Sequence, residues 1–188
     1  MGKGIRFFTG TTLYYLFKEM KMKDRNKTGK EQKMDKYLLA KPTIRMVIEW
    51  PILIGIGLIG TLFSPQKIPF SPISNIVGVV LLLIGLVIHE YSHKIHKQAH
   101  QESEKIEKLV TEGIYSRIRH PLYVGLILMY FGFALSWGIV WILIPAIIFV
   151  ILTILTAIRE EEVMKEKFRK EYEEYMRRVP WRFIPKVF

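Results

Sequence analysis

Long uncharged hydrophobic runs alternate with short blocks of charge along this chain. No Asp, Glu, Lys or Arg interrupts residues 50–66, 68–88 or 121–158. A helix needs about 20 apolar residues to cross the hydrocarbon core of a bilayer. The first two runs each fit one span. The third is too long for one span, and Ser136-Trp137-Gly138 divides it into a short helix, a tight turn and a longer helix. The pattern therefore predicts four transmembrane helices from Trp50 onward.

Nearly all basic residues after residue 18 fall on one side of these predicted helices. Lys and Arg are dense in residues 18–45, 93–119 and 159–186, whereas the links at 64–71 and 136–138 hold one Lys between them. By the positive-inside rule, the three basic blocks are cytoplasmic. In a soluble protein the net charge of +11 would suggest nucleic acid. Here it belongs to membrane-flanking blocks, so we expect the lipid bilayer as partner and no nucleic acid.

The hydrophobic pattern also predicts that the chain consists of two parts, an N-terminal segment and a transmembrane domain. Residues 1–45 form a basic N-terminal segment, and its apolar stretch Ile5–Phe17 is an interfacial helix or a truncated first span. No cleavage site of small residues follows that stretch, so it is not a secretory signal. Residues 46–188 form the transmembrane domain. The predicted fold is all-α, with four to five transmembrane helices, and the absence of Cys excludes disulfides and thiol nucleophiles.

A glycine motif lies inside the first of these hydrophobic runs. Gly55-Ile56-Gly57-Leu58-Ile59-Gly60 matches G-x-G-x-x-G. A dinucleotide site with this motif requires a preceding strand and a helix N-terminus at the phosphates. A lipid-embedded run must instead be helical to satisfy its backbone. We therefore interpret the glycines as a surface for close helix packing.

A histidine motif ends the second run. His89-Glu90-Tyr91-Ser92-His93 matches the H-E-x-x-H of zinc proteases, and His96 and His100 continue the same helix face. Catalytic zinc needs a third protein ligand, yet the only aspartates, Asp24 and Asp35, lie in the N-terminal segment. We expect no metal and interpret the stripe as polar side chains that meet lipid headgroups. A zinc protease remains an alternative.

The richest polar sequence precedes the third hydrophobic run. Arg119-His120-Pro121, here called the Arg-His-Pro corner, ends the polar stretch. Pro favours the first position of a helix, so the corner lies at a helix N-terminus, which attracts anions. Tyr115 and Tyr123 bring aromatic rings to the same region. The residues alone leave two alternatives open, an interfacial belt that anchors to lipid phosphate or a ligand site.

The last charged block predicts an amphipathic helix within residues 159–185. Its apolar face should lie on the cytoplasmic membrane surface or against the ends of the spans. The apolar positions recur at intervals of three or four and are Met164, Phe168, Tyr172, Tyr175 and Val179.

Three glutamates begin this predicted helix. Rotation at about 100° per residue directs Glu160 and Glu161 with the apolar face and Glu162 towards water. Buried carboxylates need donors or a cation as partners, and Arg117 and the Arg-His-Pro corner supply them. Pairing with these groups, or with a shared ligand, brings the start of the helix to the corner.

Four sequence elements stand out together: Leu109–Tyr115, Arg119–Tyr123, Glu160-Glu161 and Phe168–Tyr172. In combination they resemble the isoprenylcysteine carboxyl methyltransferase family in its prokaryotic form, with a related pattern in phospholipid N-methyltransferases. The resemblance covers about Leu109 to Pro185 well, and the hydrophobic layout extends it weakly towards Trp50.

The resemblance implies a helical membrane enzyme that binds S-adenosylmethionine at its cytoplasmic face, within residues 109–185, and releases S-adenosylhomocysteine. The acceptor it implies is a carboxylate of a prenylated or other lipidic or small hydrophobic molecule. We assign catalysis to Arg119, Arg117 and Glu161, with an arginine for the acceptor carboxylate. The cofactor-binding residues that the resemblance implies are Leu109, Val110, Gly113, Tyr115, His120, Tyr123, Glu160 and Glu161.

Two regions depart from the family pattern. The histidine stripe stands where a Leu-Gly pair and a Trp/Phe-Ser segment usually shape the acceptor entrance. Arg169 stands where the family often has glycine, and we place it inside a helix. Two other functions remain open: an NADPH-dependent membrane reductase of the sterol-reductase type, which has a similar Arg-His-Pro-x-Tyr element, and a non-catalytic membrane or lipid-binding protein.

Overall fold

The computed structural model describes residues 29–40, 42–96 and 107–185. It divides the chain into two compact units, Met1–Tyr37 and Leu38–Phe188. The described part of the first unit is helix α2 (Gly29–Leu38), whose last residue belongs to the second unit. The helix predicted over Ile5–Phe17 lies outside the described residues.

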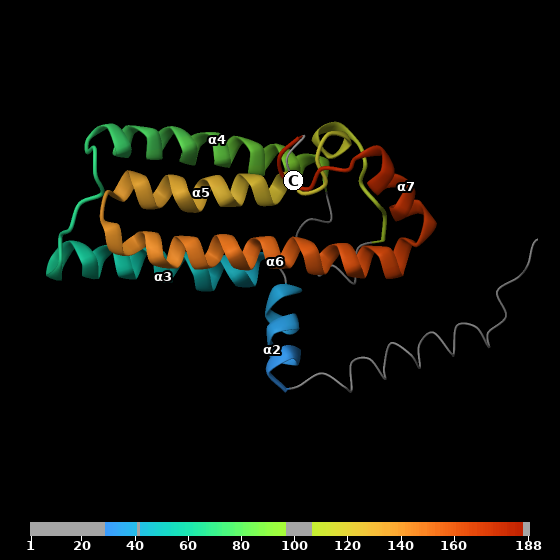
Figure 1. The fold of residues 1–188 in the computed structure, drawn as a ribbon, viewed down its shortest axis with the longest axis horizontal. Helices are drawn as coiled ribbons and strands as arrows, with labels where there is room; N and C mark the ends of the chain where they lie inside the picture. The colour runs from blue at the N-terminus through green and yellow to red at the C-terminus, as the bar shows by residue number, and fades with distance from the viewer. Residues whose placement is uncertain (1–28, 41, 97–106, 186–188) are drawn as a thin grey trace, which may run out of the picture. The chain divides into compact units, whose positions relative to one another are not determined.

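Four helices lie side by side in the second unit (Figure 1): α3 (Pro42–Phe63), α4 (Ile73–Ile95), α5 (Pro121–Trp137) and α6 (Leu143–Phe168). No strand occurs in the described ranges, which confirms the all-α class. Three helices, α3, α4 and α6 with the turn before it, are long and apolar enough to cross a membrane. At about 1.5 Å per residue, α5 reaches roughly 25 Å, less than the hydrocarbon core of about 30 Å. The fourth span stays a prediction.

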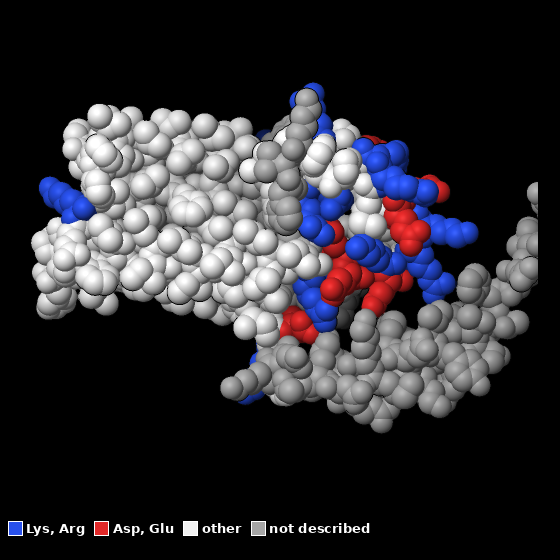
Figure 2. Space-filling view, viewed as in Figure 1, with Lys and Arg blue, Asp and Glu red and all other residues white. Residues whose placement is uncertain are grey.

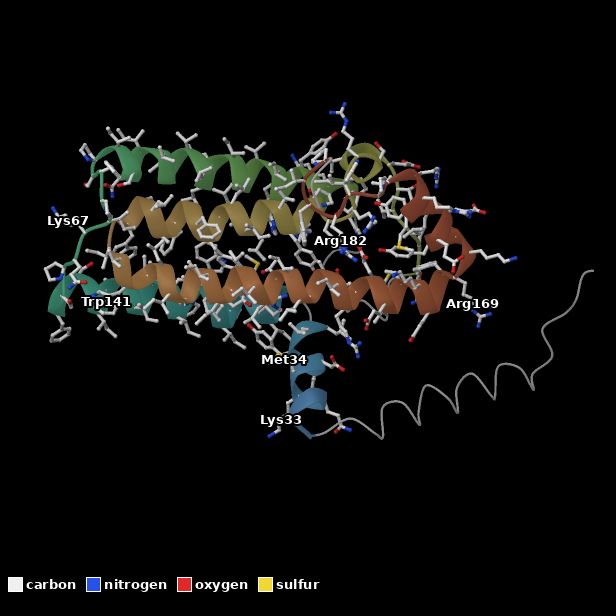
Figure 3. All side chains as sticks on the ribbon, in the orientation of Figure 1. Lys33, Met34, Lys67, Trp141, Arg169 and Arg182 are labelled. Carbon is white, nitrogen blue, oxygen red and sulfur yellow. The ribbon has the colours of Figure 1, made fainter. Side chains whose placement is uncertain are left out.

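Charged side chains gather at one end of this unit. Figure 2 shows an uncharged surface over most of the four helices and a mixed blue and red surface near α7 (Lys170–Arg178). Lys67 lies at the opposite end (Figure 3). This separation agrees with helices that cross a bilayer, and the cytoplasmic location of the charged end stays a prediction.

Helices α4 and α5 contact each other through glycines. A Cβ atom added at Gly78 would lie 2.8 Å from the carbonyl oxygen of Gly132, and one at Gly85 would lie 2.7 Å from that of Gly125. Such distances leave no room for a side chain, so small residues permit the close approach of the two backbones. The contact holds the end of α4 against the first turns of α5.

The glycine motif of the first hydrophobic run also contributes to packing. Gly57 faces the Trp137 ring, with 2.9 Å between a built Cβ and the ring, and Gly60 faces Ile139 at 3.0 Å. Gly55 has nothing within 4 Å. The packing interpretation is therefore confirmed at two of the three glycines.

The turn between α5 and α6 lies where the sequence predicted it. Gly138 ends α5 in the left-handed conformation with φ of 81°. Its carbonyl accepts a hydrogen bond of 2.8 Å from the N–H of Ile68, and the N–H of Val140 donates to Gln66 at 2.9 Å. These bonds join the two loops at the end of the bundle that carries little charge.

The predicted C-terminal helix is wrong in one respect, because it is two helices rather than one. Helix α6 ends at Phe168 and α7 begins at Lys170, with Arg169 between them at φ of 47° and ψ of −118°. The chain turns back at this residue (Figure 3). The predicted apolar face consequently closes on itself as a buried cluster of Met164, Tyr172, Tyr175 and Val179. The prediction that Arg169 lies inside a helix is therefore wrong, because it lies between two helices.

This backbone conformation generates a test. A residue with a Cβ atom at positive φ costs of order 1–3 kcal/mol, whereas glycine adopts the conformation without that cost. We expect Arg169→Gly to stabilise the protein by about 1 kcal/mol after the extra entropy of an unfolded glycine is deducted. The measurement is the thermal unfolding midpoint in detergent. Arg169→Ala is the control, since it removes the side chain but keeps the Cβ atom. An equal gain from both variants would contradict the argument.

Candidate functional site

The Arg-His-Pro corner forms the start of α5, where Pro121 occupies the first turn. The C-terminal segment runs across this start. The N–H of Arg119 donates to the carbonyl of Trp181, and the N–H of His120 donates to that of Arg182, both at 2.9 Å. These two N–H groups are therefore occupied by the chain itself, and the corner presents mainly side chains to its surroundings.

Glu161 is the centre of a network that joins α6 to this corner. Arg119 Nε donates to its carboxylate at 2.8 Å, His120 Nε2 at 3.1 Å and Arg182 Nε at 3.2 Å. A second Arg119 nitrogen, Nη1, donates to the carbonyl of Val179 at 2.8 Å. Glu161 is 1% exposed. Because an ionised carboxylate only accepts, Nε2 of His120 carries a proton. The prediction that Glu161 meets the corner is confirmed.

Glu160 turns to the other side of His120. Its Oε1 accepts a hydrogen bond of 2.7 Å from Tyr123 OH, and its Oε2 lies 4.0 Å from His120 Nδ1. The His120 and Tyr123 rings stack with centroids 5.7 Å apart. Glu162 is exposed and pairs with Arg159. The three glutamates therefore point in the directions that their rotation predicted.

Three tyrosines lie beside these charged groups. Tyr115 belongs to the short helix η2 (Gly113–Ser116), and its carbonyl accepts a hydrogen bond of 2.8 Å from Tyr175 OH. Burial raises the pKa of Tyr115, Tyr172 and Tyr175 far above the ordinary tyrosine value. The three phenols are consequently neutral at physiological pH, and their rings offer faces that attract cations.

A cavity of about 90 Å³ lies between the corner and the tyrosines. It combines one carboxylate, two basic groups, histidines and aromatic rings. Its lining residues are His96, Lys108, Leu109, Val110, Tyr115, Arg119, His120, Leu122, Tyr123, Glu160, Met164, Tyr172 and Tyr175.

Most of the residues that the sequence assigned to a site line this cavity. Three do not. Glu161 lies behind the wall and orients Arg119 and His120. Gly113 has φ of 60° and packs on Ile95, so it shapes the loop. Arg117 is exposed, and its assignment stays a prediction. The assigned residues in the lining are Leu109, Val110, Tyr115, Arg119, His120, Tyr123 and Glu160.

Sequence reasoning missed other members of the site. The periodicity marked Tyr172 and Tyr175 only as apolar positions, and nothing local distinguished Arg182, which pairs with Glu161. His96 stood in the histidine stripe without an assigned role. Met164 was likewise marked only as an apolar position, and the remaining lining residues without an assigned role are Lys108 and Leu122.

The histidine motif has a different environment from the one we expected. His89 is 5% exposed, so the headgroup interpretation is wrong for it. Its Nδ1 lies 3.4 Å from the carbonyl of Leu122, and its Nε2 lies 3.1 Å from His93 Nε2. Among the described residues no three His, Asp or Glu side chains come together as a metal site. His100 lies outside the described residues.

A second polar network lies deeper between the helices and was not predicted. Arg45 on α3 donates to Glu49 Oε1 from Nε at 3.1 Å and from Nη2 at 3.0 Å. Arg45 Nη1 also donates to Thr156 Oγ1 at 2.6 Å, and Tyr130 OH donates to the other Glu49 oxygen. Glu49 is fully buried. Ionisable groups at this depth in a membrane helix are costly and commonly functional.

A smaller cavity adjoins this network. Its volume of about 10 Å³ is room for one water molecule at most. Leu122 and Tyr123 line both cavities. One layer of side chains therefore separates the larger cavity from the polar groups inside the bundle.

The glutamate network generates a stability test. Removal of one member of a buried ion pair typically costs about 3–5 kcal/mol, because the partner charges are left unpaired. We expect Glu161→Ala to lower the free energy of unfolding by that amount in detergent. The neighbouring Glu162→Ala, at an exposed position, should change it by less than about 0.5 kcal/mol. Similar unfolding midpoints for the two variants would show that the network contributes little.

Comparison with curated proteins finds similarity to sterol reductases. A Delta(14)-sterol reductase, TM7SF2, of Mus musculus is 30% identical over 83 residues, which are 43% of this chain and 20% of that protein. A Delta(14)-sterol reductase of Arabidopsis thaliana is 28% identical over 137 residues, 65% of this chain and 37% of that protein. A probable 7-dehydrocholesterol reductase of Acanthamoeba polyphaga mimivirus is 32% identical over 87 residues, 45% of this chain and 19% of that protein. The chain thus spans well under half the length of these relatives.

A protein-family model matches the part of the chain that contains the site. The family described as phospholipid methyltransferase matches residues 73–171, from the first residue of α4 into α7. That range includes the Arg-His-Pro corner, the Glu160-Glu161 pair and most of the cavity lining. Because the match extends over more than half of the residues, the chain belongs to the phospholipid methyltransferase family.

Proposed function

We propose that this protein uses S-adenosylmethionine to methylate a lipidic or small hydrophobic acceptor at the membrane. The observation that carries the proposal is the cavity beside the corner, because it combines an acidic side chain, aromatic rings and basic groups within the family-matched residues. S-adenosylmethionine has the complementary parts: a sulfonium cation, an aromatic base and an amino-acid group with both charges.

The described residues suit these parts of the cofactor. Glu160 and the tyrosine rings suit the sulfonium and the ammonium, since both are cations. Arg119 and Lys108 bring positive charge to the same cavity and suit a carboxylate. Leu109 and Val110 offer apolar contacts to the base. The ligand-binding alternative for the corner is therefore favoured over a purely interfacial belt.

Bound S-adenosylmethionine would supply an electrophilic methyl group on sulfur. For a carboxylate acceptor, as in the isoprenylcysteine carboxyl methyltransferases, no proton has to be removed. The residues of the cavity then act by holding the two reactants in line and excluding water. Arg119 is held by Glu161 at 2.8 Å and by Val179, so we assign it to positioning and to the attraction of an acceptor carboxylate. Arg117 is kept as a surface candidate for the same attraction.

The acceptor is proposed to come from the membrane side. Tyr123 and Leu122 separate the cofactor cavity from the smaller cavity beside Arg45 and Glu49. The helices around it carry exposed apolar side chains, for example Ile76 and Val87 on α4, as expected of a surface that faces lipid. Basic residues at the charged end favour a cytoplasmic site for the cofactor.

Ligand binding to the purified protein tests the proposal. We expect S-adenosylmethionine and S-adenosylhomocysteine to bind to the wild type in detergent, as measured by isothermal titration calorimetry. Glu160→Gln removes a negative charge near the sulfonium and should weaken S-adenosylmethionine about tenfold, or roughly 1.4 kcal/mol, and S-adenosylhomocysteine less. Glu162→Gln, which removes the same charge at an exposed position, is the control. Folded wild-type protein without affinity for either ligand would refute the proposal.

A membrane reductase of the sterol type is the second candidate, and the similarity to three sterol reductases favours it. A thermal-shift comparison of NADPH with S-adenosylhomocysteine separates the two functions. Stabilisation by NADPH alone would replace the methyltransferase proposal. Transfer of a labelled methyl group into lipid extracts would in turn exclude a non-catalytic lipid-binding protein.

A further inference from the structure

His96 is the first residue after α4 and lines the larger cavity. Its N–H donates to the carbonyl of Ser92 at 2.9 Å, which closes the last turn of the helix. Its ring lies 5.6 Å from that of Tyr115. The helix end and the tyrosine therefore hold the imidazole at the cavity wall.

One nitrogen of this imidazole has an unusual environment. Nδ1 of His96 is buried and has no hydrogen-bond partner among the described residues. A buried polar atom without a partner costs about 1–3 kcal/mol, and most such atoms in proteins are paired. His89 and His93, earlier in the same stripe, bond to each other at 3.1 Å. Among the described histidines of the stripe, the unpaired nitrogen thus belongs to the one that lines the cavity.

The charge state of His96 narrows the kind of ligand group that would pair with it. Burial lowers the pKa of His96, so the ring is neutral at physiological pH. A neutral imidazole carries one proton, and in the tautomer protonated on Nε2 the Nδ1 atom is an acceptor. The ammonium of the amino-acid part would prefer the carboxylate of Glu160, which lines the same cavity. Hydroxyl and amino groups without charge are the donors that suit His96.

We propose that His96 is a ligand-positioning residue whose Nδ1 accepts a hydrogen bond from a hydroxyl or amino group of the adenosine part of the cofactor. The inference rests on the proposed function and extends it to a residue outside the Arg-His-Pro and glutamate elements. The third histidine of the stripe then serves in nucleoside recognition, while His89 and His93 pair with each other within the protein.

Three substitutions at this position test the proposal by calorimetry with two ligands, S-adenosylhomocysteine and 5′-methylthioadenosine, which lacks the amino-acid part. His96→Asn keeps an acceptor near Nδ1 and should bind both ligands within about threefold of the wild type. His96→Gln, which carries its amide near the position of Nε2, and His96→Phe, which has a ring without nitrogen, should each weaken both ligands about tenfold. His93→Phe removes an imidazole from the same helix outside the cavity lining and should leave both affinities unchanged.

The outcomes are distinct. Equal affinities for His96→Asn and His96→Gln would overturn the assignment of Nδ1, and both are polar substitutions whose folding is checked by thermal unfolding. A loss confined to S-adenosylhomocysteine would also overturn it, because the contact would then involve the amino-acid part. If the wild type binds both ligands and His96→Phe binds them equally well, this inference fails and the proposed function stands. Wild-type protein that binds neither ligand would overturn the proposed function and this inference with it.

Discussion

The buried carboxylate of Glu161 is the interaction on which the site depends. A charge that is 1% exposed is stable only with donors around it, and Arg119, His120 and Arg182 supply them from two distant parts of the chain. The network therefore determines where α6, the start of α5 and the C-terminal segment meet. His120 donates to Glu161 through Nε2 at the edge of its ring, and a face of the same ring stacks on Tyr123. Glu161 thus orients Arg119 and His120, which line the cavity, without lining the cavity itself.

The shape of the cavity depends equally on the break between α6 and α7. A straight continuation of α6 would carry Tyr172 and Tyr175 away from Tyr115. The positive φ of Arg169 turns α7 back, so that Tyr175 donates to the carbonyl of Tyr115 at 2.8 Å. Strained backbone of this kind is commonly retained where the geometry of a site requires it.

The histidine motif illustrates how a sequence pattern and its environment can disagree. H-E-x-x-H spacing places His89 and His93 on one helix face, and the structure brings their Nε2 atoms to 3.1 Å. That proximity follows from their spacing of one helical turn, and the glycine contact between α4 and α5 places His89 beside the carbonyl of Leu122. The same contact directs His96 to the cavity. Helical spacing and the packing of α4 on α5 account for the positions of the described histidines.

The amino-acid sequence by itself determined the four long helices α3 to α6, the turn at Gly138 and the directions of the three glutamates, because hydrophobic runs and helical rotation are local properties. It also indicated that Glu161 would meet the Arg-His-Pro corner, since a buried charge requires a partner. Only the tertiary structure revealed Arg182, the exposed location of Arg117, the position of His96 in the cavity lining and the Arg45–Glu49 network. Arg182 pairs with Glu161 and His96 reaches the cavity through contacts between residues far apart in the chain. Arg45 and Glu49 are one turn apart on α3, but their burial depends on Thr156 and Tyr130 from other helices, and periodicity within a single helix contains no information about such contacts.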